Sequence, residues 1–250
     1  MPFKKHQSLE NVPDNSKIWR YITLARFISL LERKQLYFHN IRGFEDRFEG
    51  RYTPVDFDPE KNPNYRIAYD NAKIDLNIER AKFINAWHLN DFESEAMWEL
   101  YTNKLEGIAI QSTFLRLKNS FKHCQEIVYI GKVEYKDRRN ELTDLSDKDG
   151  ILVNFVKDVS YEFEKELRVL LHLPAKITEK INNKTKAKWE NAVKNGGIYA
   201  NVDLEKLIGG VLISPFAEKW FTEVVEGILE KYEIGKNKIV KSSLSWNPLY

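Results

Sequence analysis

The sequence is short of cysteine, of long apolar runs and of net charge. Cys124 is the one cysteine among 250 residues, which excludes an internal disulfide and a metal site built from several thiolates. No stretch approaches the roughly 18 consecutive apolar residues that a membrane-spanning helix needs, so we expect no membrane contact. The basic N-terminus is not followed by an apolar segment. We therefore expect no secretory signal and a cytoplasmic protein.

Charge is nearly balanced overall but is uneven along the chain. The 39 Lys and Arg against 37 Asp and Glu give a formal net charge of +2, too little for a nucleic-acid coat protein. Residues 176–194, however, contain many lysines and few acids around Trp189. Lys186 and Lys188 are candidates to hold a phosphate backbone, and Trp189 is a candidate to stack on a base. The alternative for this segment is a solvated helix face.

Several common catalytic motifs are missing. The sequence has no glycine-rich phosphate loop, no dinucleotide-binding fingerprint, no zinc-protease motif and no serine nucleophile elbow. The five histidines never pair at metal-ligand spacing, so we expect no zinc site. Two acids alone, Glu164 and Glu166, suit Mg²⁺, which leaves a metal-dependent nuclease as a third-ranked hypothesis.

The stretch 159–174 places acids and an arginine directly before an apolar run. If it is extended, Glu164, Glu166 and Arg168 share one face while the alternate apolar residues face a core. We interpret the charged face as the floor of a site in which the two glutamates are catalytic. Two other interpretations remain open: a charge ladder on a solvated strand edge, and a structural ion network in which Arg168 neutralises the acids.

Apolar periodicity and turn residues predict a mixture of short strands and helices. Helical spacing predicts helices over 24–34 and 151–159, and a third helix that Ser94 caps. Residues 18–22 and 127–135 are predicted strands. Because strands and helices do not alternate regularly, we expect an α+β fold with a mixed, mainly antiparallel sheet.

The predicted organisation is one large domain. Residues 1–17 are polar and are expected to form a lead-in, and residues 18–250 a single α+β domain. Within it, we expect a basic helical excursion at 176–195.

Four stretches together resemble an uncharacterised bacterial domain family. Its members share an aromatic-basic-tyrosine strand, an Asn-Asp-Pro-Phe-Glu loop, a Met-Trp-x-x-Tyr helix followed by glycine, and an E-x-E-x-R strand. The matching residues are Trp19-Arg20-Tyr21, Asp46-x-Phe48-Glu49, Met97-Trp98-x-x-Tyr101 with Gly107, and Glu164-x-Glu166-x-Arg168. The loop departs from the pattern, since Glu45 and Arg47 replace Asn and Pro. The resemblance implies architecture more than chemistry. Asp46, Glu49 and Arg168 are taken from it as substrate-binding candidates.

The opening strand and helix and the late E-x-E strand are also similar to those of ADP-ribosyltransferases that modify nucleic acid. This resemblance implies that Arg20 contacts the pyrophosphate of NAD and that Tyr21 or Trp98 stacks on nicotinamide. Tyr101 shares the helix face of Trp98 and is a further candidate for this site. Glu166 would orient the ribose 2′-hydroxyl and stabilise the positive charge that develops when the glycosidic bond breaks. A core role for the tryptophan face is the alternative.

Two classes of function follow from these patterns. The leading hypothesis is an ADP-ribosyltransferase that uses NAD as a substrate and modifies a nucleic acid or protein. Such an enzyme would be a toxin or phage-defence effector, with an antitoxin or other partner protein. The competing hypothesis is a non-enzymatic sensor module that binds a nucleotide or a nucleic acid.

Overall fold

The structure is a computed structural model that describes residues 3–44, 46, 48–78, 82–143, 150–172 and 183–245. The helices and strands, in chain order, are β1 (Lys17–Thr23), α1 (Leu24–Arg33), β2 (Gln35–Asn40), α2 (Tyr65–Ile78), β3 (Lys82–Leu89), α3 (Glu95–Tyr101), β4 (Gly107–Thr113), α4 (Phe114–Ser120), β5 (Val128–Lys132), β6 (Glu134–Lys136), β7 (Val156–Asp158), β8 (Glu166–His172), α6 (Asn183–Lys194), β9 (Gly197–Asn201), α7 (Leu204–Leu207), β10 (Gly210–Ile213), α8 (Lys219–Lys231) and β11 (Ile239–Val240).

The chain forms two compact units, and each is assembled from three separate segments. Unit 1 contains Met1–Asn11, Tyr37–Ala86 and Cys124–Ala200, and unit 2 contains Val12–Leu36, Trp87–His123 and Asn201–Tyr250. The residues expected as a lead-in are therefore divided between the two. Because the strands pair mostly antiparallel, with helices distributed among them, the α+β prediction is confirmed.

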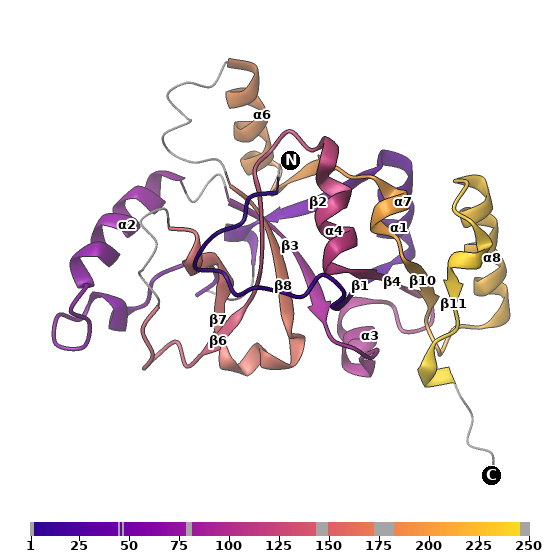
Figure 1. Cartoon of the computed structure of the whole chain (residues 1–250), viewed down its shortest axis with the longest axis horizontal. Coiled ribbons are helices and arrows are strands. Elements are labelled where there is room, and N and C mark those ends of the chain that lie inside the picture. Colours follow the sequence, from indigo (N-terminus) through magenta and orange to yellow (C-terminus); the bar gives the residue numbers. More distant parts are fainter. Residues whose placement is uncertain are drawn as a thin grey trace, which may run out of the picture. The chain divides into compact units, whose positions relative to one another are not determined.

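Unit 2 is built on the antiparallel pairing of β1 with β4. Trp19 lies opposite Gln111 and Tyr21 opposite Ala109 in this register. Strand β10 pairs antiparallel with the other edge of β4, and β11 pairs parallel with β10 (Figure 1). One core of the unit lies on the tryptophan face of β1, where α3 packs. It consists of Trp19, Tyr21, Met97, Trp98, Ala109 and Leu212.

Local signals set the helix ends in unit 2. Helix α1 begins after Thr23, whose hydroxyl accepts the Arg26 N–H, and ends at Lys34 in the left-handed conformation. Helix α3 follows Ser94, whose hydroxyl accepts the Met97 N–H. Both predicted helices are confirmed, because short-range capping and an apolar face are sufficient to define them.

Unit 1 is built on the antiparallel pairing of β5 with β8. Val128 lies opposite Leu171 and Gly131 opposite Arg168. The strands β6 and β7 form a separate parallel pair, seen side by side in Figure 1. The core of the unit contains Ile41, Ile84, Tyr129, Ile151, Phe155 and Leu170. The N-terminal segment joins it, since the Lys4 N–H donates to the Val128 carbonyl oxygen (2.9 Å).

The helix predicted over 151–159 is wrong. This segment instead forms a 3₁₀ turn (Leu152–Phe155), then β7, then a second 3₁₀ helix (Val159–Glu164). Two polar side chains explain the difference. The Asn154 amide donates to the carbonyl oxygens of Gly150 and Ile151, and the Asp158 carboxylate accepts the Ser160 N–H. These bonds take the place of helical ones.

Two further expectations are refined by the structure. The strand predicted over 127–135 is interrupted at Val133, between β5 and β6. The basic excursion is helical from Asn183 to Lys194, and residues 176–182 lie outside the described residues. Among the described residues, no helix has the length and apolar character needed to span a bilayer.

Candidate functional site

Five charged side chains are buried together in unit 1. We call them the ion cluster: Glu49, Lys157, Glu164, Glu166 and Arg168. Their side chains are between 1% and 7% exposed, so all five have lost most of their hydration. Burying charges in this way is costly unless they neutralise one another in good geometry.

Arg168 occupies the centre of the ion cluster. Its Nη2 lies 2.5 Å from Glu166 Oε2 and its Nε donates to the same oxygen (2.6 Å). Nη1 is ion-paired with Glu49 and also donates to the Asn154 carbonyl oxygen (2.7 Å). The guanidinium thus joins the loop that carries Glu49, the turn before β7 and the strand β8.

Lys157 neutralises the other end of the ion cluster. Its ammonium lies 2.5 Å from Glu164 Oε2 and 3.8 Å from Glu166 Oε1, and it sits over the Tyr161 ring. Glu164 ends a 3₁₀ helix, so it does not share a strand with Glu166 as expected. Lys165 turns the chain between them in the left-handed conformation (φ 42°), which brings both carboxylates to Lys157.

Burial and charge act in opposite directions within the ion cluster. Burial raises the pKa of Glu49, an effect that the nearby Arg168 opposes and Glu166 reinforces. The acids around Arg168 raise its pKa despite burial, so this guanidinium stays charged. Glu166 also donates its backbone N–H to the Tyr135 hydroxyl (2.7 Å). The acids and the two cations of the cluster therefore neutralise one another in the folded chain.

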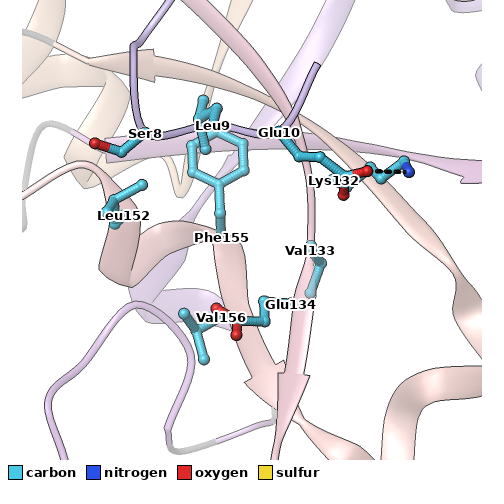
Figure 2. A pocket seen from close by; sticks show the side chains of 9 residues that line it. All are labelled: Ser8, Leu9, Glu10, Lys132, Val133, Glu134, Leu152, Phe155 and Val156. Carbon is cyan, nitrogen blue, oxygen red and sulfur yellow. Dashed lines mark hydrogen bonds and ion pairs between the residues drawn. The ribbon is translucent and has the colours of Figure 1, made fainter. Parts of the chain in front are cut away.

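A half-open cavity of about 380 Å³ lies in unit 1. Figure 2 shows its lining, in which Leu9 and Phe155 point toward one another and Glu10 pairs with Lys132. The lining residues are Ser8, Leu9, Glu10, Lys132, Val133, Glu134, Leu152, Phe155 and Val156. A volume of this size lies within the range of small-molecule sites.

The ion cluster and the cavity use the same stretch of backbone. Val156 lines the cavity, whereas the next residue, Lys157, reaches the cluster, as expected for successive strand positions. Likewise, Phe155 lines the cavity, whereas the carbonyl oxygen of the preceding residue, Asn154, accepts a hydrogen bond from Arg168. At the break between β5 and β6, the Val133 N–H donates to the Glu166 carbonyl oxygen (2.9 Å). The cluster thus holds the cavity wall in place.

In unit 2 the structure brings together two of the residues predicted to bind NAD, Tyr21 and Trp98. Tyr21 and Trp98 pack edge to face with ring centroids 5.0 Å apart, and both are buried. Tyr101, at the end of α3, is exposed. Arg20 extends over the Trp87 ring (5.9 Å), and burial together with Arg26 lowers its pKa to about 10. Trp98 is fully enclosed, so its indole presents no open face to a ligand.

The remaining candidates lie in unit 1. Trp189 is buried against Phe83, with centroids 5.4 Å apart, and Lys188 is ion-paired with Glu126. The Lys186 side chain lies outside the described residues. Asp46 accepts the Phe48 N–H (2.9 Å), as expected of a residue that closes a turn. Among the described residues, no cluster of His, Cys, Asp or Glu is arranged to hold a metal ion.

Sequence reasoning missed Lys157 and the cavity. Lys157 lies in the segment that the sequence analysis interpreted as a helix. It belongs to β7, which has three residues and is too short for the alternation of a strand to be recognised in the sequence. The cavity is assembled from residues 8–10, 132–134 and 152–156, and no local signal links them. The chain matches no protein-family model, no curated protein and no solved structure.

Proposed function

We propose that this chain is a non-enzymatic sensor module that binds a small, uncharged ligand with a flat apolar ring in the cavity of unit 1. The observation that carries the proposal is the cavity itself, whose lining is mixed: Leu9, Leu152 and Phe155 are apolar, whereas Ser8, Glu10, Lys132 and Glu134 are polar. Small-molecule sites combine apolar walls with polar groups that fix the orientation of the ligand.

The charges at the margin favour a neutral ligand that donates hydrogen bonds. Glu10 is paired with Lys132 (2.9 Å) and Glu134 with Lys136 (3.1 Å), so both lysines next to the cavity are already neutralised. A phosphate would add negative charge beside two carboxylates. Their remaining lone pairs suit hydroxyl or amine donors. A nucleoside combines a flat ring with such hydroxyls, and it is therefore a better fit than a nucleotide.

The wall that receives the ligand is held rigidly. Arg168 fixes the backbone at Asn154 through a hydrogen bond to its carbonyl oxygen, and the Lys157 side chain is held by its ion pair with Glu164. A preorganised wall lowers the entropic cost of binding. The acids that sequence reasoning assigned to catalysis therefore serve, in this proposal, as positioning residues for the cavity.

Isothermal titration with adenosine, guanosine, cytidine and uridine tests the proposal. We expect at least one nucleoside to bind, and its 5′-monophosphate to bind more weakly. Val156→Phe fills the cavity and should weaken binding by about tenfold or more, equivalent to roughly 1.4 kcal/mol. Val224→Phe, on an exposed turn of α8, is the matched control and should bind like the wild type. Binding of no nucleoside, or equal binding by the Val156 variant, would contradict the proposal.

ADP-ribosyl transfer from NAD to a nucleic acid or protein is a second proposal, supported by one observation in unit 2. Burial first, and the charge of the neighbouring Arg26 second, lower the pKa of Arg20 to about 10. Two guanidinium groups in this relation suit a pyrophosphate, since an anion would relieve their repulsion.

Labelled NAD and a cell extract test this second proposal. We expect label transfer by the wild type and a loss of about tenfold or more for Arg20→Gln, since a charged hydrogen bond is worth roughly 1.5–3 kcal/mol. Arg66→Gln, at an exposed position of unit 1, is the control. Absence of label transfer, or Glu166→Gln activity equal to that of the wild type, would rule the transferase out.

A further inference from the structure

Four rings form a continuous row on unit 1, apart from the cavity. Tyr37 packs against Tyr199 (5.1 Å between centroids) and against His39 (6.2 Å), and His39 packs against Phe44 (5.3 Å). We call these four residues the aromatic row. They come from β2, β9 and the turn after β2, which are joined by the Asn40 N–H donating to the Gly196 carbonyl oxygen (2.9 Å).

The row lies on the open side of its strands. Along β2, Leu36, Phe38 and Asn40 are buried, whereas Tyr37 is 37% exposed and His39 is half-buried. The same alternation occurs along β9, where Tyr199 lies between buried Ile198 and Ala200. The rings therefore lie on the side of the strands opposite the buried residues.

Two glycines hold the rings in place. A Cβ at residue 197 would overlap the Tyr37 ring and hydroxyl, and a Cβ at residue 43 would overlap the His39 ring. Each ring therefore rests on bare backbone. His39 donates from Nδ1 to the Asn40 carbonyl oxygen (2.8 Å), which leaves Nε2 as an acceptor in the neutral ring. The row offers flat ring surfaces and at least one hydrogen-bonding edge.

Within the two segments that carry the row, charge has one sign, although Glu45, Asp46 and Glu190 flank these segments in the sequence. Residues 35–44 and 191–201, which build it, contain Arg42 and Lys194 and no acidic residue. Both cations are exposed. Proteins commonly bind single-stranded nucleic acids with aromatic rings on a strand surface and cations beside them. The rings stack on the flat faces of the bases, and the cations attract the negatively charged phosphates.

We propose that the aromatic row binds single-stranded nucleic acid by stacking bases on Tyr37 and Tyr199. This site is separate from the nucleoside cavity, and it does not depend on the proposed function. Duplex regions are poor ligands for such a surface, because their bases are already stacked and face inward. The expected specificity is therefore for strandedness rather than for sequence.

Fluorescence anisotropy with labelled oligonucleotides of about ten nucleotides tests the proposal, a length within the usual range of site sizes. We expect oligo(U) and oligo(dT) to bind and a duplex of the same length to bind at least tenfold more weakly. Tyr37→Ala and Tyr199→Ala should each weaken single-strand binding by about tenfold, as expected for loss of one stacked base. Tyr37→Phe and Tyr199→Phe keep the ring and should bind like the wild type.

Three kinds of control variant separate stacking from charge and from misfolding. Tyr69→Ala removes an exposed ring on α2 and should leave the affinity unchanged. Arg42→Gln should reduce the dependence of affinity on salt without changing the preference for single strands. The tyrosine-to-phenylalanine variants report on folding, since they preserve packing. Equal binding of duplex and single strand, or alanine variants at residues 37 and 199 that bind like the wild type, would overturn the proposal.

Discussion

Replacing Arg168 with methionine lowers the free energy of unfolding by about 3–5 kcal/mol, the range observed when one partner of a buried ion pair is removed. The substitution leaves the carboxylates of Glu49 and Glu166 buried without their shared cation. It also leaves the Asn154 carbonyl oxygen without the Nη1 donor. Urea unfolding monitored by circular dichroism measures the loss. A decrease below about 1 kcal/mol, the scale of exposed ion pairs, would show that water reaches the cluster.

Glu49→Gln is the companion variant, and its effect on the free energy of unfolding is expected to depend on pH. The folded state raises the pKa of Glu49, so the folded state binds the proton more tightly than the unfolded state. The stabilisation is complete below the ordinary pKa of glutamate, about 4.3, and is lost as pH rises through the raised value. Glutamine cannot ionise. As pH rises above about 4.3, the variant should therefore lose less stability than the wild type. If the stability of the variant and of the wild type changed with pH in the same way, the raised pKa of Glu49 would be contradicted.

Replacing Trp98 with alanine lowers the free energy of unfolding by about 3–5 kcal/mol, as expected for truncation of a fully buried aromatic side chain. The indole packs on Tyr21 and donates from Nε1 to Glu93 (3.2 Å). Glu93 in turn accepts from Ser242 and Ser243, so the substitution disturbs a network as well as a core. Thermal and urea unfolding both measure the effect.

Tyr101→Ala is the matched control on the same helix. Tyr101 is 41% exposed, and its loss should change stability by no more than about 0.5 kcal/mol. The pair of variants also separates two roles for the tryptophan. A stacking platform for nicotinamide would lose ligand binding with little loss of stability, whereas a core residue loses stability first. A stable, well-folded Trp98→Ala protein would contradict the core assignment.

The two proposed binding sites have the same physical origin. In both, charged or aromatic side chains rest on backbone that the core has already ordered: the ion cluster behind the cavity wall, and Gly43 and Gly197 beneath the aromatic row. Both sites are already formed in this structure. Both should therefore bind with little loss of chain entropy.

The sequence by itself determined the elements whose signals are local. Thr23 and Ser94 cap their helices through hydroxyls within three residues, and the apolar spacing over 24–34 identifies the buried face of α1. The α+β class follows from the same short-range patterns. The sequence also identified Glu164, Glu166 and Arg168 as a group, because these three charged residues stand close together directly before an apolar run.

Only the tertiary structure decided what those charges do. Lys157 and Glu49 come from segments that are distant or differently patterned, and they ion-pair with the acids and the arginine of the 159–174 stretch in a buried cluster. The cavity and the aromatic row depend in the same way on contacts between residues far apart in the chain. Local propensity acts over a few residues, whereas the free energy of burying a charge depends on every group that surrounds it, and that environment exists only once the chain has folded.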